Sequence, residues 1–375
     1  MSTGTFIILC LEGAVLSFNV AASSALIPSI AADFALSQFV VGKIIWLYML
    51  PYGLAAFFYG PLVRLWDARK LELFCIFLFS LANLLAGLSQ NIATLFAARV
   101  LMGLFGASVI PLGLIVIAKR LEPLKRGRYI GLFFGSTFIA SLLGLFLSGI
   151  INWRLIFVIP AVCGFILWIF MYFYLPSFKE EVGNFRLGYL EAFKNKRVIQ
   201  IFSYIFLVSL IYHAVQQWLG VYFSMQLNLN QFFISLLITL TSLAGIFGEV
   251  WGGRLADSIG RLRVVNLGIV SMVLCIFLLL IKLPLGLLAM VMIIWGLGWT
   301  FNHVGLATML TDLPAELLNE AASLNSGVRF ISGGLGVSLG GLIMQKSFAL
   351  GFSVFGLGLM VLLVFSRVMR NKLKV

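Results

Sequence analysis

Long runs of hydrophobic residues alternate along this chain with short polar connectors that carry most of its charge. Each run is close to the roughly 20 residues with which an α-helix crosses the hydrocarbon core of a bilayer. The strands of a membrane barrel would instead alternate weakly over about ten residues. The pattern therefore predicts an all-α polytopic membrane protein with twelve transmembrane helices. The expected spans lie near residues 5–29, 39–60, 71–89, 92–118, 129–151, 155–175, 198–224, 231–252, 264–281, 285–310, 320–344 and 348–367.

Composition supports the same class. Of 375 residues, 62% are hydrophobic and 10% are charged, whereas soluble proteins have about 45–50% and about 25%. Twelve crossings leave no room for a soluble catalytic domain, so we do not expect an enzyme. The first run, 6–26, has neither a basic segment before it nor a small-residue cleavage site after it, which predicts a retained span.

The net charge of +13 reflects membrane topology. Twenty of the 26 lysines and arginines lie in every second connector or at the C-terminal end of the chain. Cytoplasmic loops carry such an excess, so both termini are expected in the cytoplasm of a cell that holds the protein in its plasma (inner) membrane. The spread of these charges along the chain argues against nucleic-acid binding. It predicts contact between the basic connectors and anionic lipids.

Neither the cysteines nor any known catalytic motif of the sequence points to a bound cofactor. The four cysteines lie inside hydrophobic runs without paired spacing, so disulfide, metal and redox roles are disfavoured. Phosphate-binding loops, nucleophile elbows and metal motifs are absent from the sequence. We therefore expect no cofactor and no metal, and direct ATP coupling would need a separate subunit.

An internal duplication divides the chain. The long polar connector 176–197 separates a first half, 1–175, from a second half, 198–375. Gly144 and Gly149 recur as Gly336 and Gly341, each at an offset of 192 positions. Two sets of six parallel spans are an architecture of secondary transporters.

The most specific motif lies between the eighth and ninth spans. It reads Gly253-Arg-Leu-Ala-Asp257-Ser-Ile-Gly260-Arg261-Leu-Arg263. Its glycines permit a tight turn, its aspartate can face a helix N-terminus, and its arginines can bind acidic groups or lipid phosphate. This segment resembles the loop signature of the major facilitator superfamily.

Other segments resemble the same family in the expected order along the whole chain. They are Arg99-Val-Leu-Met-Gly103 in the fourth span, Arg126-Gly-Arg128 before the fifth, and Trp153-Arg154 at the start of the sixth. The resemblance implies two pseudo-symmetric six-helix bundles that work by alternating access. It also implies that helices 1, 2, 4, 5, 7, 8, 10 and 11 surround a central cavity.

Three positions depart from the family pattern. Arg64 stands where the first-half copy of the loop usually has aspartate, and Gly144-Leu145 replaces the glycine-proline pair of antiporter branches. Asn319 replaces an arginine that is frequent in the second-half connector. The second departure weakens an antiporter assignment.

The family arrangement brings helix 2 against helix 11 and helix 5 against helix 8, which suggests a cytoplasmic gate of ion pairs between the halves. In this hypothesis Glu320 takes the place of Arg128, and Arg64 that of Asp257, so that the two gate pairs have reversed polarity. The alternative is that these are solvated loop charges. The gate residues are Arg64, Asp67, Arg69, Arg128, Glu249, Gly253, Asp257, Gly260, Arg261, Asp312, Glu316 and Glu320.

Ionisable residues inside the spans are candidates for proton coupling, because each costs at least about 2.5–3.5 kcal/mol at mid-bilayer. Glu12 is the first candidate, and helix pairing is its alternative. Arg99 resembles the family arginine implicated in coupling, but it lies outward of Glu12, so no direct pair is expected. His213 and His303 either titrate or contact substrate.

Polar and aromatic residues of the cavity-forming helices are candidates to bind substrate. Arg329 either attracts an anionic substrate or neutralises a buried carboxylate, and Trp218 is a further candidate for stacking. Polar residues are expected on the cavity helices and not on helices 3, 6, 9 and 12. The candidates are Asn19, Tyr48, Tyr52, Tyr212, Gln216, Gln217, Trp295, Trp299, Asn302, Asn325 and Arg329.

Together these patterns favour a monomeric secondary transporter, similar to the drug and metabolite:proton exporter branches. We expect proton-driven efflux of small amphipathic or organic compounds, with protons and membrane lipids as the other partners. One alternative is a symporter or facilitator for a small anionic or polar metabolite, favoured by Arg99 and Arg329. Others are a lipid or lysolipid translocase, which needs a lateral opening, and a receptor.

Overall fold

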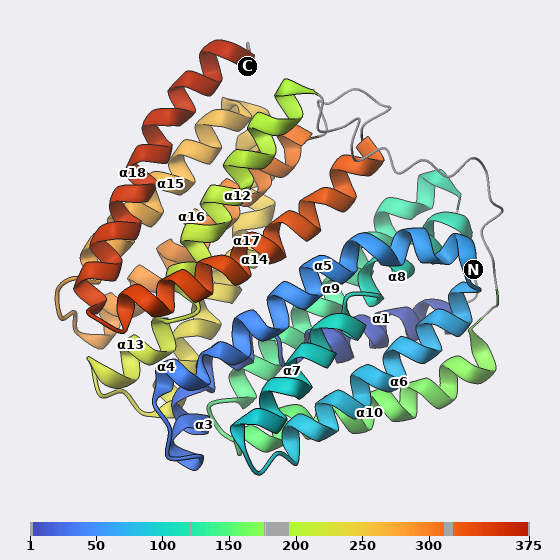
Figure 1. Ribbon diagram of the computed structural model, residues 1–375. Helices are drawn as coiled ribbons and strands as arrows, with labels where there is room; N and C mark the ends of the chain where they lie inside the picture. Colours follow the sequence, from blue (N-terminus) through green and yellow to red (C-terminus); the bar gives the residue numbers. More distant parts are fainter. Residues whose placement is uncertain (1–2, 121, 176, 178–194, 311–317, 374–375) are drawn as a thin grey trace. The chain divides into compact units, whose positions relative to one another are not determined.

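The computed structural model describes residues 3–120, 122–175, 177, 195–310 and 318–373 (Figure 1). Regular structure in these residues is helical, with no strand among them. The helices are α1 (Thr3–Ser17), α2 (Ala22–Ala25), α3 (Ile27–Asp33), α4 (Gln38–Val41), α5 (Lys43–Leu65), α6 (Ala68–Gly87), α7 (Ile92–Gly106), α8 (Val109–Arg120), α9 (Pro123–Leu147), α10 (Trp153–Tyr174), α12 (Lys196–Gln216), α13 (Leu219–Met225), α14 (Gln231–Ile259), α15 (Arg261–Leu278), α16 (Leu285–Leu310), α17 (Leu318–Met344) and α18 (Phe348–Leu373).

The predicted all-α class with twelve spans is confirmed. Twelve segments of the described chain are long and hydrophobic enough to cross a membrane. Some of these spans consist of two helices: the first joins α1 to α2 through Asn19, and the seventh joins α12 to α13 through Trp218. α14 extends seven residues beyond the predicted end of its span, to Ile259, and carries the start of the loop motif.

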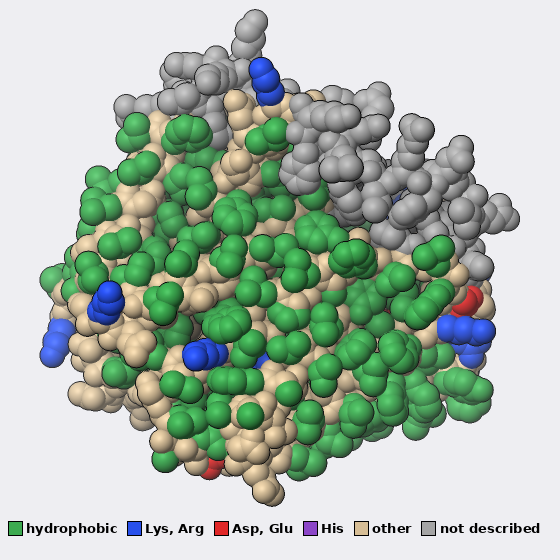
Figure 2. Space-filling model, viewed as in Figure 1, with side chains coloured by type: hydrophobic (Ala, Val, Ile, Leu, Met, Phe, Trp, Pro, Cys, Tyr) green, Lys and Arg blue, Asp and Glu red, His purple; other side chains and the backbone are tan. Residues whose placement is uncertain are grey.

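Hydrophobic side chains cover the outside of the helices. α10 exposes 51% of Phe170 and 71% of Phe173, and α18 exposes 66% of Val361. Figure 2 shows one face on which hydrophobic side chains are spread among few lysines and arginines. This surface suits contact with lipid, because helices satisfy their backbone hydrogen bonds internally and present apolar side chains to the hydrocarbon.

The chain divides into two compact units, Met1–Arg186 and Leu187–Val375. In unit 1, α1 packs on α9, α5 packs on α7 and α6 packs on α10. In unit 2, α12 packs on α17, α14 packs on α16 and α15 packs on α18. The order of pairing is the same in both units, as a duplicated chain requires.

Close helix contacts repeat at the same sequence offset. A Cβ atom at Gly144 would overlap the backbone carbonyl of Phe18, and one at Gly336 would overlap that of Leu210. Both members of the second pair lie 192 positions after those of the first. The glycines allow the two backbones to approach closely, which is a common device of helix pairing in membranes. The duplication therefore includes the contacts between helices.

Capping side chains mark where several helices begin. Asn91 at the start of α7 accepts a hydrogen bond of 2.9 Å from the backbone of Thr94. Asn230 at the start of α14 accepts one of 3.1 Å from Phe233. These bonds satisfy N–H groups that have no partner within the helix. Short polar connectors thus end one span and begin the next.

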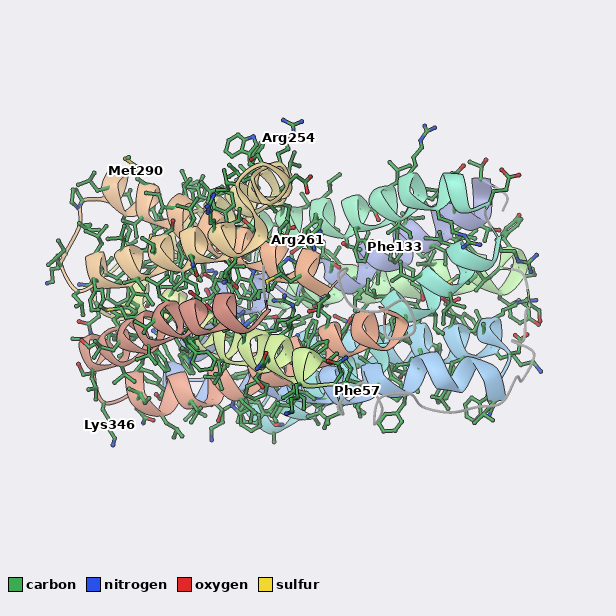
Figure 3. The ribbon with its side chains drawn as sticks, turned by 90° about the horizontal axis from the view of Figure 1, so that it is seen from above. Phe57, Phe133, Arg254, Arg261, Met290 and Lys346 are labelled. Atoms are coloured by element: carbon green, nitrogen blue, oxygen red, sulfur yellow. The ribbon has the colours of Figure 1, made fainter. Side chains whose placement is uncertain are left out.

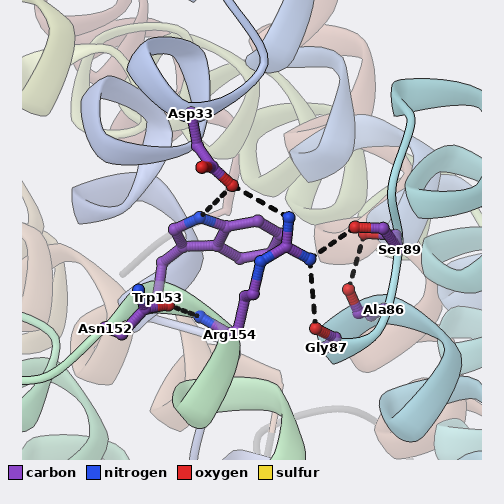
Figure 4. A network of polar contacts seen from close by, with 7 residues as sticks. All are labelled: Asp33, Ala86, Gly87, Ser89, Asn152, Trp153 and Arg154. Atoms are coloured by element: carbon purple, nitrogen blue, oxygen red, sulfur yellow. Dashed lines mark hydrogen bonds and ion pairs between the residues drawn. The ribbon is translucent and has the colours of Figure 1, made fainter.

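A polar network ties three connections of unit 1 together at the start of α10 (Figure 4). The guanidinium of Arg154 donates to the carboxylate of Asp33 at 2.9 Å, to the carbonyl of Gly87 at 3.3 Å and to that of Ser89. The indole of Trp153 donates to the same carboxylate at 3.2 Å. The Trp-Arg pair noted in the sequence therefore fixes the ends of α3, α6 and α10.

Candidate functional site

Unit 2 contains a cluster of aromatic rings from α12 and α16. The rings of Tyr212 and Trp299 stack with their centroids 3.8 Å apart and an interplanar angle of 8°. Trp295 stacks on Tyr212 at 5.4 Å, and its indole donates a hydrogen bond of 2.6 Å to the side chain of Gln216. Rings at such distances attract one another beyond their hydrophobic burial. The cluster is therefore a rigid aromatic platform.

A buried arginine lies beside this platform. The guanidinium carbon of Arg329, on α17, lies 5.8 Å from the ring centroid of Trp299. Its Nε donates to Asn325 at 2.9 Å, whereas its buried Nη2 has no hydrogen-bond partner. Only 9% of Arg329 is exposed. A buried guanidinium with a free donor is suited to bind an acceptor group of a ligand.

The two histidines border the same platform. The ring of His213 meets that of Trp299 edge to face at 5.5 Å, and its Nδ1 lies 2.8 Å from the carbonyl oxygen of Ser209. The Nδ1 of His303 lies 2.9 Å from Oε1 of Glu249. Sequence reasoning assigned Glu249 to the gate, but its described partner is this histidine inside the span. We call these residues the aromatic–basic cluster: Tyr212, His213, Gln216, Glu249, Trp295, Trp299, His303, Asn325 and Arg329.

Other predicted residues of unit 2 lie differently. Asn302 is fully buried, and a Cβ at Gly268 of α15 would contact it, so this asparagine packs towards the ninth span. Trp218 donates 2.9 Å to the carbonyl of Val337 and packs on Gly341, which makes it a packing residue rather than a platform for substrate. Gln217 lies beyond the end of α12 and is partly exposed.

Unit 1 buries two carboxyl groups. Glu12 on α1 and Glu72 on α6 are both 0% exposed, and none of their four carboxylate oxygens has a hydrogen-bond partner. The two groups interact electrostatically. Glu12 was expected from the sequence, whereas Glu72 was missed although it is the second residue of a predicted span. The rule that selected Glu12 would also have selected Glu72.

Polar residues are also present on the third span, contrary to the prediction. On α6, Ser80 and Asn83 are 0% exposed, as is Glu72. The side-chain amide of Asn19 donates to that of Asn83 at 2.5 Å. Helix 3 therefore supplies polar contacts to helix 1 inside the bundle, a role that only the packing of the neighbouring helix reveals.

Arg99 of α7 lies in an aromatic environment. Its guanidinium carbon lies 4.5 Å from the ring centroid of Tyr48, and its Nε donates 3.0 Å to the carbonyl of Ile44. Tyr52 packs near Tyr48 with ring centroids 5.6 Å apart. None of the contacts described for Arg99 is with Glu12, in agreement with the separation expected from the sequence.

Two of the expected gate residues have described partners within unit 1. Asp67 caps α6 by accepting from the backbone of Lys70 at 3.1 Å, and Arg69 donates to the carbonyl of Tyr172. Arg128 and Asp257 are exposed. Asp312 and Glu316, and the side chains of Arg64 and Glu320, lie outside the described residues. The gate stays a prediction.

The loop motif forms the turn between α14 and α15. Gly260 has φ +96°, which favours glycine, while a Cβ at Gly253 would meet nothing within 4 Å. Arg261 donates 2.8 Å to the carbonyl of Thr308 near the end of α16, where a cation is favoured. Arg254 extends away from the helices (Figure 3). Arg261 thus joins the start of α15 to the end of α16 through a backbone carbonyl.

In the described part of the chain, no group of three or more His, Cys, Asp and Glu residues could hold a metal ion. The candidate residues form two sets, one within each unit. The aromatic–basic cluster of unit 2 combines aromatic rings with a buried guanidinium, and unit 1 holds two buried carboxyl groups.

Comparison with known proteins agrees with this architecture. The family model of the Major Facilitator Superfamily matches residues 9–341. The uncharacterized MFS-type transporter YbcL of Bacillus subtilis is 24% identical over 96% of this chain and 94% of that protein. The purine ribonucleoside efflux pump NepI of Salmonella paratyphi B is 21% identical over 90% of this chain and 86% of that protein.

Solved structures show the same fold. A mutant of the nucleoside transporter NupG superimposes with a TM-score of 0.79 at 15% identity, covering 97% of this chain and 99% of that one. A bacterial homolog of the human lysosomal transporter Spinster, inward-facing and occupied, gives a TM-score of 0.78 at 14% identity, covering 99% and 98%. The resemblance noted in the sequence is thus confirmed.

Proposed function

Since the chain belongs to the major facilitator superfamily, we propose that this membrane transporter exports small organic compounds with a planar ring in exchange for protons. The observation that carries the proposal is the stack of Tyr212 and Trp299 with the guanidinium of Arg329 5.8 Å from the indole. These groups combine a flat apolar surface with a fixed donor. A planar molecule with a hydrogen-bond acceptor satisfies both.

The platform suits ring recognition because it is already rigid. Trp295 is fully buried and bonded to Gln216, and only 8% of Tyr212 is exposed. A ligand that binds there orders few side chains, which favours affinity. The efflux relative NepI is named for purine ribonucleosides, whose base is a planar ring. This name supports the proposed substrate class.

Proton exchange rests on the carboxyl group of Glu12. The residue is fully buried without a hydrogen-bonding partner, a location in which a charged group is costly. Intramembrane carboxyls of this kind serve proton relays in transporters. An exchange of substrate for protons would use the inward proton gradient to drive efflux.

Uptake of an organic anion is a second candidate, favoured by the unbonded Nη2 of Arg329. An arginine with a free donor can bind a carboxylate as well as a ring nitrogen or carbonyl. The inward proton gradient of a cell would drive both uptake by symport and efflux by antiport, but accumulation of an external probe inside vesicles requires an alkaline interior for symport and an acidic interior for antiport. They can therefore be separated in vesicles.

The test uses purified transporter in proteoliposomes with radiolabelled inosine as a neutral planar probe and benzoate as an anionic one. Exchange predicts that an acidic interior drives accumulation of external inosine and that nigericin abolishes it. We expect W299A to lose this transport and W251A to retain it, since Trp251 is 51% exposed. Accumulation driven only by an alkaline interior would establish symport, and no transport of either probe would refute the proposal.

A further inference from the structure

The two fully buried carboxyl groups of unit 1 interact electrostatically with each other and with one neighbouring thiol. The thiol of Cys75, one turn after Glu72 on α6, interacts electrostatically with both carboxyls. Its sulfur lies 3.6 Å from the hydroxyl of Tyr59, which donates 2.8 Å to the carbonyl of Leu104. Glu12 on α1 and Glu72 and Cys75 on α6 thus form one group of interacting titratable side chains, and none of the three brings a positive charge.

The described basic side chains of unit 1 either have partners other than the two carboxyls or lie at the surface. Arg69 donates to the carbonyl of Tyr172, Arg99 to that of Ile44, and Arg154 contacts Asp33. Lys43, Lys70, Arg120 and Arg128 are exposed. Arg126 is half-buried. No hydrogen bond joins any described group to the oxygens of Glu12 or Glu72.

Two carboxylates without a cation repel each other and lose their hydration on burial. A site of this kind is stable when at least one of the two groups is protonated, as in paired carboxyls that share a proton. The two groups then titrate together, so that the state of one depends on the state of the other. Glu72 thereby joins Glu12 in a single site.

We propose that Glu12 and Glu72 form one proton-binding site inside unit 1, at which a single proton is bound and released during transport. On release, the O–H bond of one carboxyl breaks, its electrons stay on the carboxylate, and the proton passes to water; binding reverses each step. Release leaves two buried charges, which favours a conformation that admits water. The inference rests on the proton exchange proposed above and assigns Glu72 a role in it.

Infrared spectroscopy of the full-length protein tests the site without any substrate. Protonated carboxyl groups absorb separately from carboxylates, so their loss can be followed as the pH is raised. In E12Q the midpoint for Glu72 should differ from that of the wild-type pair by about one pH unit or more, and E72Q should show the same for Glu12, because the coupling is reciprocal. The exposed Glu122 supplies the matched control E122Q, which should titrate as wild type.

Transport measurements test the role of the site. E12Q and E72Q should each lower inosine accumulation driven by the proton gradient at least tenfold while keeping inosine counterflow without a gradient. E72D should restore accumulation, because it returns a carboxyl group. If counterflow falls as far as driven transport, or if E72Q accumulates as wild type, Glu72 has no coupling role.

The outcomes separate this inference from the proposed function. Failure of the wild-type protein to transport inosine or benzoate would refute the proposed function, while the infrared titration would still report whether the carboxyls are coupled. If the remaining carboxyl in both single variants kept the midpoint of the wild-type pair while inosine transport was normal, the shared site alone would be refuted.

Discussion

Gly144 of α9 lies directly against the backbone carbonyl of Phe18 at the end of α1. No side chain fits between them, since a Cβ atom would overlap the carbonyl oxygen and its carbon. The glycine that precedes Leu145, where antiporter branches have proline, is therefore a contact point between two spans. Its counterpart in unit 2, Gly336 against Leu210, has the same geometry.

Substitution of Gly144 by alanine should destabilise the protein by about 1–3 kcal/mol, because overpacking forces the backbones apart. G336A should have a similar effect. The control is G131A on the same α9, where a Cβ would meet nothing within 4 Å. Thermal unfolding in detergent micelles measures the difference, and equal stability of G144A and G131A would contradict it.

The hydrogen bond between the side chains of Asn19 and Asn83 should stabilise unit 1. N83A leaves the buried amide of Asn19 without its 2.5 Å acceptor and should cost about 1–3 kcal/mol. The double variant N19A/N83A should cost less than the sum of the single variants, since both partners of the bond are then gone. Exposed Gln90 provides Q90A as a control. Additive effects in this cycle would show that the bond contributes nothing.

Arg154 should contribute more through backbone carbonyls than through its ion pair. The side chains of Arg154 and Asp33 are 32% and 44% exposed, so D33N should cost at most about 1 kcal/mol and less at high salt. R154A also removes the bonds to Gly87 and Ser89 and should cost about 1–3 kcal/mol at any salt concentration. Unfolding at two salt concentrations checks this order. A larger effect of D33N would reverse the interpretation.

Arg329 should distinguish anionic from neutral ligands. R329Q keeps hydrogen-bond donors and removes the charge beside Trp299, so we expect benzoate to bind at least tenfold more weakly and inosine to change less than threefold. Charged hydrogen bonds contribute about 1.5–3 kcal/mol, which corresponds to that loss. Equilibrium binding in detergent measures both ligands. Equal losses for the two would indicate that Arg329 supports the platform rather than contacting the ligand.

Much of the candidate site could be predicted from residue type and helical spacing. Tyr212 and Gln216 are four residues apart on α12, as are Trp295 and Trp299 on α16, so each pair was expected on one helix face. The structure brings the two faces together in one stack. Gln217 and Asn302, which were also expected among the cavity residues, are not in it. Gln217 follows the end of α12, and Asn302 packs against Gly268 of α15.

Hydropathy by itself determined the number and approximate limits of the spans, because a bilayer sets one minimum length for every helix that crosses it. Which polar residues meet was decided only by tertiary packing. Glu72 and Glu249 lie near the ends of their spans, where the sequence allows either an interfacial or a buried position. Their partners, Glu12 and His303, lie on other helices. Distances between helices depend on all the contacts of a bundle, so no local pattern specifies them.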